Sequence, residues 1–519
     1  MRRLKGFLIA LAVSMGGVEA AAQVDTAWTR RYNGPANGGD LASALTVDGS
    51  GNVYVTGQSD SDTGTFTINT DYATIKYSPS GDTLWVRYYN GPGNDYDEAT
   101  ALSVDNGGNV CVTGYSGIYP DYDYATLKYA PDGDTLWNRR YDGSGNASDY
   151  ARDLAVDPGG NIYVTGYSAG AGTSNDYATI KYSPAGDTLW IRRYNGPDNS
   201  DDYAFALAVD DSGNVYVTGE SWEGGSNYDY ATIKYSPFGD TLWVRKYNGT
   251  GNLSDAAYDL AVDDGGNVYI TGVSYDGSTS NDYVTIKYSP AGDSLWVRRY
   301  NGPGNDVDYA YDLAVDGSGN VYVTGYSGGS GTSYDYATIK YSPSGDTLWV
   351  ARYNGPGNDD DNATALSLDG AGNVYVAGRS VGSGTDDDYT TIKYSPAGDT
   401  LWVARYNGFG SGGDHASGLA LDGSGNVYVT GRSDGSGTEA DYATIKYVQS
   451  CVAIPGDANS SGDFSIGDII SVVNYYFNKP GWPACGSNSP LCWLSGMLCR
   501  GDWNGNGVIS IGDIVHGVN

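Results

Sequence analysis

Short runs of alternating apolar and polar residues, bounded by Gly, Pro, Asn and Asp, fill most of the chain. One representative stretch contains four such runs, at residues 313–316, 320–324, 336–342 and 347–353. Short runs rich in Val, Ile, Tyr and Thr predict β-strands, and the residues between them predict tight turns. The sequence therefore predicts an all-β chain, with little helix before the C-terminal tail.

The four-strand unit recurs eight times, about every 53 residues, a spacing typical of solenoids, propellers and arrays. Four short strands per unit predict the blade of a β-propeller. The region begins at about residue 25 with a fourth strand, whereas the last unit lacks one. We therefore expect the two ends to complete one blade, closing an eight-bladed propeller over residues 23–449. The most regular mark of the unit is a tryptophan, at Trp28, Trp85, Trp137, Trp190, Trp243, Trp296, Trp349 and Trp402.

Two turns of the unit, Asp316–Asn320 and Ser342–Asp346 in the sixth repeat, hardly vary between units. Their Gly, Asn, Asp and Ser residues supply positive φ angles or local hydrogen bonds. In an up-and-down blade these two turns share one face of the ring, and the other two connections share the opposite face. Sequence variation is concentrated in the latter, so we expect any specific function on that face.

The segments GNVYVTG and DYATIKYSP-x-GDTLWVRRYNG, preceded by AVD, resemble the SBBP-type β-propeller repeat of bacterial exported proteins. The resemblance covers roughly residues 25–448. It implies the propeller fold and leaves the activity open, because one fold serves many functions.

Residues 1–22 have the features of an export signal. Basic residues at Arg2, Arg3 and Lys5 precede an apolar run from Phe7 to Val18 and three alanines ending at Ala22. No later stretch approaches the ~20 apolar residues that a transmembrane helix needs. We therefore expect a secreted protein, free or attached to the cell surface, without membrane insertion.

The chain carries 62 acidic and 29 basic residues, a formal net charge of −33. This charge disfavours nucleic acids and anionic lipids, whose phosphates it would repel. Cations and polysaccharides remain as ligand classes, and we expect the propeller to be monomeric.

Three charged positions recur in every unit: an aspartate opening the inner strand, a lysine on the third strand, and an aspartate starting that strand, from Asp71 to Asp441. They are expected to cap turns or to pair with one another, because buried unpaired charges are costly. The alternative is a cation-binding ring of eight carboxylates. The inner-strand aspartates are Asp40, Asp97, Asp149, Asp202, Asp255, Asp308, Asp361 and Asp414, and the lysines are Lys76, Lys128, Lys181, Lys234, Lys287, Lys340, Lys393 and Lys446.

Catalytic candidates are few. The chain has two histidines, His415 and His516, and its carboxylate pairs repeat, whereas acid/base catalysis needs carboxyls in different environments. The one propeller tryptophan outside the repeat position is Trp222, beside Glu223 in a variable loop. We predict that this pair binds a sugar ring; the alternative is a loop residue folded onto its neighbour.

Two segments of the tail have calcium-ligand spacing. Calcium needs six or more oxygen ligands, a glycine at position 6 permits the sharp turn, and position 7 contributes only its carbonyl, so Val508 is compatible. Gly462 and Gly507 occupy position 6, and an apolar segment predicting a helix follows each loop. The expected ligands of two calcium ions are Asp457, Asn459, Ser461, Asp463, Ser465 and Asp468 in the first loop, and Asp502, Asn504, Asn506, Val508, Ser510 and Asp513 in the second.

These paired loop–helix halves resemble a type I dockerin over about residues 455–519, within a tail domain of residues 450–519. The resemblance implies a small α-helical calcium-binding domain that docks onto a cohesin-type partner. The positions expected to recognise cohesin are Ile466, Gly467, Ile511 and Gly512, which lack the hydroxyl residues of many dockerins. A cysteine-bearing insertion also separates the halves.

The tail holds four of the five cysteines, Cys451, Cys485, Cys492 and Cys499. In an exported chain this grouping suggests two disulfides, with three possible pairings, and a structural zinc site is the alternative. Cys111 stands alone among the repeats, where it replaces a tyrosine as a small buried residue.

The sequence thus predicts an exported, non-catalytic binding or display module whose dockerin-like domain tethers it to a cohesin-type partner or another surface scaffold. The expected ligand of the propeller is a carbohydrate, such as a polysaccharide, or another surface ligand. Two alternatives remain. One is a polysaccharide-degrading enzyme, a glycoside hydrolase or lyase with its site on the variable face. The other is a structural surface or adhesion protein.

Overall fold

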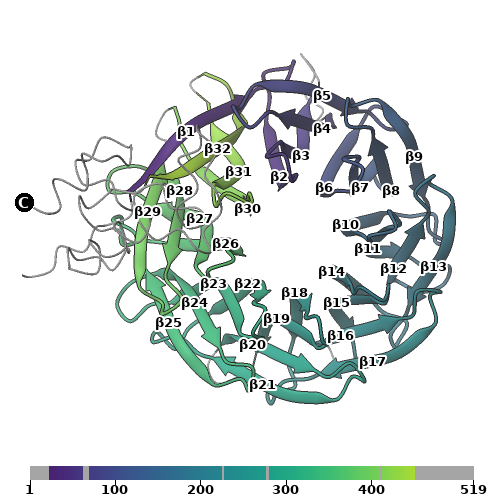
Figure 1. Cartoon of the computed structure of the whole chain (residues 1–519). Helices are drawn as coiled ribbons and strands as arrows, with labels where there is room; N and C mark the ends of the chain where they lie inside the picture. Colours follow the sequence, from purple (N-terminus) through teal and green to yellow (C-terminus); the bar gives the residue numbers. More distant parts are fainter. Residues whose placement is uncertain are drawn as a thin grey trace, which may run out of the picture. The chain divides into compact units, whose positions relative to one another are not determined.

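The computed structural model describes residues 23–61, 69–224, 227–275, 277, 280–409, 412–435 and 437–450. Residues Thr26–Val448 form one compact unit. Its strands make eight four-stranded antiparallel sheets around a central opening (Figure 1). The predicted eight-bladed propeller with four-stranded blades is confirmed. The export signal, the tail cysteines, the calcium loops and His516 lie outside the described residues, and the described residues contain no helix able to cross a membrane.

The blades are numbered in chain order, with β2–β5 as blade 1 and β30, β31, β32 and β1 as blade 8. The inner strands are β2 (Asp40–Val47), β6 (Tyr96–Val104), β10 (Asp149–Val156), β14 (Asp202–Val209), β18 (Asp255–Val262), β22 (Asp308–Val315), β26 (Asp361–Leu368) and β30 (Asp414–Leu421). The second strands are β3 (Val53–Asp60), β7 (Val110–Ile118), β11 (Ile162–Ala169), β15 (Val215–Trp222), β19 (Val268–Tyr275), β23 (Val321–Gly328), β27 (Val374–Val381) and β31 (Val427–Asp434).

The third strands are β4 (Thr70–Tyr77), β8 (Asp121–Tyr129), β12 (Asn175–Tyr182), β16 (Tyr228–Tyr235), β20 (Asn281–Tyr288), β24 (Tyr334–Tyr341), β28 (Asp387–Tyr394) and β32 (Ala440–Ser450). The outer strands are β5 (Thr83–Tyr89), β9 (Thr135–Tyr141), β13 (Thr188–Tyr194), β17 (Thr241–Tyr247), β21 (Ser294–Tyr300), β25 (Thr347–Tyr353), β29 (Thr400–Tyr406) and β1 (Gln23–Tyr32).

The inner and second strands extend further than the sequence predicted. In blade 6 the inner strand begins at Asp308, not at residue 313, and Asp308 pairs with Ser327. A β-bulge between Ala310 and Asp312 interrupts the alternation of the strand. Because a bulge adds one unpaired residue, the apolar–polar pattern changes phase there and hides the first half of the strand.

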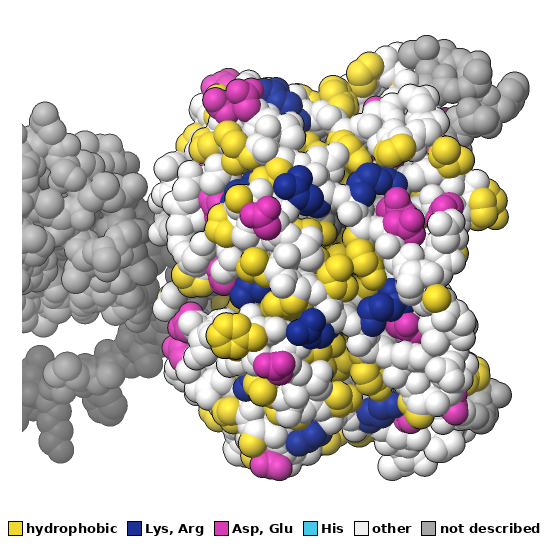
Figure 2. All heavy atoms as spheres, turned by 90° about the vertical axis from the view of Figure 1, so that its right-hand side faces the viewer, with side chains coloured by type: hydrophobic (Ala, Val, Ile, Leu, Met, Phe, Trp, Pro, Cys, Tyr) yellow, Lys and Arg dark blue, Asp and Glu magenta, His cyan; other side chains and the backbone are white. Residues whose placement is uncertain are grey.

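The core lies between neighbouring blades. Trp243 of β17 packs against Tyr216 of its own blade and Tyr288 of the next, with ring centroids 6.2 Å apart in both pairs. Its indole Nε1 donates to the carbonyl of Pro290, 3.2 Å away in the next blade. The recurring tryptophan therefore joins each blade to the following one. The rim over β9, β13 and β17 presents basic side chains spaced between hydrophobic ones (Figure 2).

Strand β1 closes the ring by pairing with β32, which lies beside it although it comes from the other end of the repeat region (Figure 1). Trp28 of β1 is 8% exposed and donates to the carbonyl of Pro79 in blade 1. The Arg31 guanidinium lies 2.8 Å from Asp441 on β32 and donates to the Ser433 carbonyl. The predicted closure of one blade by the two ends is confirmed.

Candidate functional site

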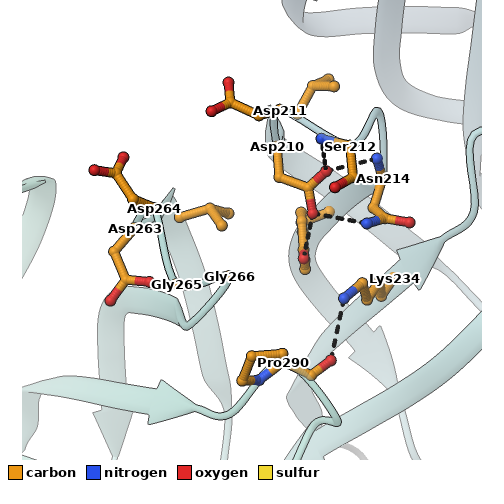
Figure 3. A pocket seen from close by; sticks show the side chains of 13 residues that line it. Asp210, Asp211, Ser212, Asn214, Lys234, Asp263, Asp264, Gly265, Gly266 and Pro290 are labelled. Atoms are coloured by element: carbon orange, nitrogen blue, oxygen red, sulfur yellow. Dashed lines mark hydrogen bonds between the residues drawn. The ribbon is translucent and has the colours of Figure 1, made fainter.

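One face of the ring, here called the turn face, carries the two nearly constant turns of each blade, except that blade 8 lacks the second one. Between blades 4 and 5 it contains a pocket of about 320 Å³ lined by Asp210, Lys234 and Pro290 (Figure 3). Asp210 accepts hydrogen bonds from Asn214 and Tyr216. Similar pockets lie between other blades. Because the same residues line each pocket and hydrogen-bond one another, we assign the turn face to architecture.

The repeated lysine caps a turn of the next blade: in six blades its ammonium group donates to a proline carbonyl there. Lys234 donates to the Pro290 carbonyl at 3.1 Å and lies over the Tyr216 ring, 4.9 Å from its centroid. In blade 2, where Cys111 replaces the corresponding tyrosine, Lys128 pairs instead with Asp105 at 2.9 Å. Cys111 is fully buried, as expected, and burial raises its pKa to about 12.

The aspartate that opens each inner strand caps the connection leading into that strand. Asp40 is fully buried and accepts a hydrogen bond from the backbone N–H of Gly34 at 2.6 Å. The equivalent glycine N–H reaches the aspartate in every other blade. Burial raises the pKa of Asp40 to about 6, although hydrogen bonds oppose this. These contacts favour the capping role over the cation ring.

The aspartate at the start of the third strand pairs with an outer-strand arginine in six blades. Blade 1 has Tyr88 at the arginine position, and burial raises the pKa of its aspartate, Asp71, to about 6. Blade 4 has Lys246 there, and Lys246 forms an ion pair with Glu223. The carboxylate of Glu223, a predicted ligand-binding residue, is thus engaged within the protein.

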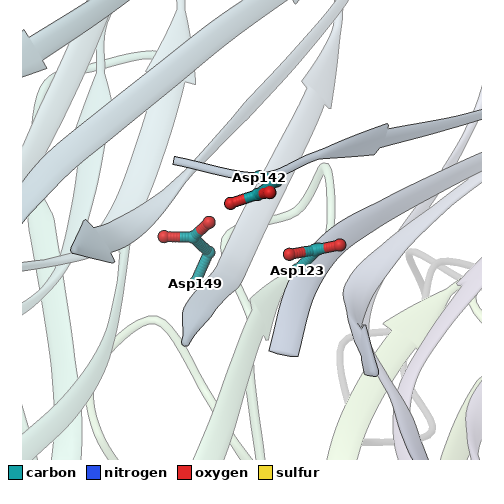
Figure 4. A group of neighbouring side chains, drawn as sticks. All are labelled: Asp123, Asp142 and Asp149. Carbon is teal, nitrogen blue, oxygen red and sulfur yellow. The ribbon is translucent and has the colours of Figure 1, made fainter. Parts of the chain in front are cut away.

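Three carboxylates, Asp123, Asp142 and Asp149, bring oxygens within 4.8 Å of one another (Figure 4). Asp142 stands where the other seven units have asparagine. Asp123 pairs with Arg140 at 2.6 Å, and Asp149 accepts the N–H groups of Gly143 and Ala169. Two of the three carboxylates therefore already have protein partners.

The variable face differs from the turn face because its residues do not repeat. Partly exposed aromatic side chains from the inner, second and third strands of blades 2–6 gather at the strand ends of this face. We call this set the tyrosine wall. It comprises Tyr96, Tyr115, Tyr122, Tyr150, Tyr167, Tyr203, Phe205, Trp222, Tyr228, Tyr258, Tyr309, Tyr311, Tyr326 and Tyr334.

Ring contacts connect the tyrosine wall from blade to blade. Tyr115 of blade 2 meets Tyr150 of blade 3 at 4.8 Å between centroids, and Tyr167 of blade 3 meets Tyr203 of blade 4 at 4.7 Å. Further along, Tyr258 of blade 5 stacks on Tyr309 of blade 6. Since the rings remain partly exposed, the wall offers a row of aromatic surfaces that crosses several blades.

Three charged groups lie within the tyrosine wall. Glu98 accepts hydrogen bonds from Tyr96 and Tyr115 at 2.9 and 2.5 Å. The Arg152 guanidinium lies 5.2 Å from the centroid of the Tyr167 ring. Glu220 is paired with Tyr203 across β14 and β15, and burial raises its pKa to about 7. The wall can therefore both stack on a ligand and exchange hydrogen bonds with it.

Trp222, the other predicted ligand residue, is the last residue of β15 and does not lie in the following loop. The prediction that Trp222 lies in a loop is wrong, because β15 pairs with β16 as far as Trp222 and Tyr228. Its indole is partly exposed and packs edge-to-face on Tyr228 at 5.0 Å. Trp222 therefore belongs to the tyrosine wall and also folds onto its neighbour.

Blades 7 and 8 carry a charged cluster at the same strand ends. Asp387 accepts from Arg379 at 2.6 Å and lies 2.9 Å from Nε2 of His415, the one histidine of the propeller. A guanidinium nitrogen of Arg432 lies 3.3 Å from the His415 ring nitrogens. We call Arg379, Asp387, His415 and Arg432 the arginine cluster. Neither it nor the extended tyrosine wall was predicted from the sequence.

Comparison with known proteins supports the fold. Five segments match the family model described as a beta-propeller repeat, SBBP, at residues 27–62, 139–172, 189–225, 295–331 and 402–437. The crystal structure of Chaetomium thermophilum Sqt1 aligns with a TM-score of 0.54 and 11% identity, covering 83% of this chain and 98% of Sqt1. The polysaccharide lyase Uly1 aligns with a TM-score of 0.44 and 13% identity, covering 70% and 92%. No curated protein sequence matches the chain. The chain thus carries SBBP-type propeller repeats, and the alignment with Sqt1 supports the same fold.

Proposed function

We propose that this chain is an exported binding module that takes a carbohydrate along the tyrosine wall. The observation that carries the proposal is the contrast between the faces: the turn face repeats its residues, whereas the variable face gathers aromatic side chains that most other blades lack at the same positions. A non-repeating surface built on a repeating scaffold is where specificity can arise.

The chemistry of the tyrosine wall suits sugars. Aromatic faces pack against the C–H surface of a pyranose ring, and tyrosine hydroxyls exchange hydrogen bonds with its hydroxyls. Tyr150, Tyr167 and Tyr203 are partly exposed and belong to consecutive ring contacts over blades 3 and 4. A row of such surfaces fits a polymer better than a single small molecule.

Removing two adjacent rings is expected to weaken glycan binding. In Tyr150→Ala/Tyr167→Ala the rings, 5.1 Å apart across β10 and β11, are both lost. We expect the Kd for the best ligand on a glycan array to rise about tenfold or more. Tyr88→Ala, at a 45% exposed outer-strand tyrosine, is the control and should bind normally. Equal binding by all three proteins, or no array signal at all, would contradict the proposal.

Glu220 favours a second candidate, a polysaccharide-degrading enzyme. A carboxyl with a pKa raised to about 7 by burial suits a general acid or base at neutral pH. Release of reducing ends from the bound glycan, abolished in Glu220→Gln with binding retained, would identify this activity. Binding without release supports the non-catalytic module.

We further propose that the tail tethers the propeller through two calcium ions held by the loops beginning at Asp457 and Asp502, with a cohesin-type domain or other surface scaffold as partner. Calcium is expected to raise the helicity and the melting temperature of the tail, because its carboxylates repel one another without the ion. Calorimetric titration of the full chain should detect two sites. In Asp457→Ala/Asp502→Ala the heat should vanish, whereas an unchanged titration would contradict both loops.

A further inference from the structure

The arginine cluster breaks the repeat at one defined position. The sixth residue of the second strand is Arg379 in blade 7 and Arg432 in blade 8. Elsewhere this position carries Gln58, Tyr115, Tyr167, Glu220, Val273 and Tyr326. Most other propeller arginines belong to the outer strands, where they pair with an aspartate or donate to carbonyls of a turn. Arg379 and Arg432 are therefore not required by the repeat.

The two guanidinium charges of the cluster are not cancelled by its single carboxylate. Asp387 accepts from both Arg379 and His415, so its carboxylate neutralises one guanidinium. The contacts of Arg432 are to the His415 ring, and among the described residues no carboxylate lies within ion-pair distance of Arg432. Arg379 and His415 keep 33% and 29% of their side chains exposed. The cluster thus presents an excess positive charge on a chain whose net charge is −33.

The arginine cluster adjoins the tyrosine wall. Asn362 pairs with Arg379 across β26 and β27, and β26 packs against β22, the strand that carries Tyr311 in the preceding blade. Tyr311 in turn lies against Tyr309 and Tyr326, with ring centroids 6.1 and 5.8 Å away. One continuous surface therefore passes from aromatic rings to the guanidinium groups of the arginine cluster.

We infer that the arginine cluster is a subsite for a uronic acid residue, whose carboxylate meets Arg432 and Arg379 while its ring, or the next sugar, packs on the wall at Tyr311 and Tyr326. This inference rests on the proposed function and names the class of its ligand. The planar guanidinium fork matches a carboxylate bidentately. The acidic surroundings would repel a densely charged polyanion, so the ligand is a glycan with carboxylates and not a nucleic acid.

The test compares matched ligands. The full chain is titrated with oligosaccharides that each carry a single galacturonic, glucuronic, mannuronic or guluronic acid residue among neutral sugars, and with the same oligosaccharides after reduction of that carboxyl to a neutral alcohol. We expect at least one uronate to bind about tenfold or more tightly than its reduced form. The preference should weaken as salt rises, because salt screens partly exposed charges.

Arg432→Gln is expected to abolish most of this preference, and Arg432→Lys, which keeps the charge but loses the fork, to restore part of it. Arg298→Gln, the same change on the outer strand β21, is the control and should bind as the wild type does. Thermal melts establish that each variant is folded.

Equal binding of acidic and reduced glycans, or a preference for acidic glycans that Arg432→Gln leaves unchanged, would overturn the inference. The carbohydrate proposal would still stand if the Tyr150→Ala/Tyr167→Ala variant loses glycan binding. A preference for sulfated over carboxylated glycans would also overturn it. Failure of every glycan, neutral or acidic, would overturn both.

Discussion

Deletion of residues 25–34 is expected to lower the melting temperature of the propeller by at least about 10 °C. The deletion removes the outer strand of blade 8, exposes the edge of β32, and takes away the ion pair of Arg31 with Asp441. It also removes Gly34, whose backbone N–H donates a hydrogen bond to Asp40. Blade 8 is left with three strands, and the N-terminal end of the chain no longer ties it to blade 1.

Point substitutions test whether the deletion destabilises the propeller through the lost contacts of β1 or only by shortening the chain. Trp28 and Trp296 are both 8% exposed and both donate to a proline carbonyl of the next blade. If β1 is an integral strand, Trp28→Ala should destabilise about as much as Trp296→Ala, by roughly 3–5 kcal/mol. Chemical denaturation measures both. A silent Trp28→Ala beside a damaging Trp296→Ala would mean that the ring does not depend on its N-terminal strand.

The stability of the ring is expected to rise as the pH is lowered from 7.5 to about 5. Burial raises the pKa of several aspartates above the ordinary 3.8, to about 6 at Asp40, Asp149 and Asp361 and to about 7 at Asp153. These groups hold their protons better in the folded ring than in the unfolded chain. The free energy of unfolding therefore falls as the pH rises from about 4 to about 7. Relief of repulsion among the net negative charges acts in the same direction.

Below about pH 4 the trend should reverse. The first-turn aspartates, Asp48 and its equivalents, are partly buried, but hydrogen bonds from asparagine side chains and backbone N–H groups outweigh burial and lower their pKa. These aspartates stabilise the folded ring at pH values above the ordinary aspartate pKa. This stabilisation is lost as the pH falls through their lowered pKa. The melting temperature should consequently be highest in mild acid, where we expect it to exceed its value at pH 7.5 by several degrees.

Asp153→Ala tests the origin of this dependence. Ala206 stands at the same position in blade 4, so the fold accommodates the change there. The variant should show a smaller gain in melting temperature between pH 7.5 and 5 than the wild type, whereas Asp211→Ala, at an exposed turn residue, should leave the gain unchanged. A melting temperature that rises steadily from pH 5 to pH 8 in the wild type would contradict the assignment.

Much of the fold follows from local pattern. The recurring tryptophan, the Asp-x-x-Gly-Asn turn and the Ser-Pro-x-Gly-Asp turn are short-range signals, and they predicted the number of blades and the closing strand correctly. The repeated aspartate was correctly expected to open each inner strand, but the run of alternating residues begins later, because the bulge after Ala310, and its equivalents, shifts the alternation. A bulge depends on pairing with the second strand, which local pattern does not show.

The candidate site was harder to predict. Trp222 can be singled out in the sequence because every other propeller tryptophan occupies the repeat position. The tyrosines of the wall cannot be distinguished by residue type, because the chain has 48 tyrosines. Their common feature is a register position, opposite one another on β10 and β11 for Tyr150 and Tyr167. Aligning the eight units by that position would have revealed both the wall and the substitution of arginine at residues 379 and 432. Contact across blades, such as His415 with Asp387, requires the closed ring.

The joint between blades has an evolutionary consequence. Trp137 and Arg139 of one blade donate to the carbonyls of Pro184 and Gly186 in the next, so their acceptors are main-chain atoms. A main-chain carbonyl survives any substitution that preserves the turn. The tryptophan donor recurs in all eight units, whereas the arginine donor recurs in six and is replaced by Ala351 and Ala404 in blades 6 and 7. The proline acceptor is missing only at the seam, where the chain continues into Val448 and the Trp402 indole nitrogen has no partner among the described residues. Units can therefore be duplicated or exchanged by recombination without redesigning a joint. Selection on the opposite face can then change one blade at a time.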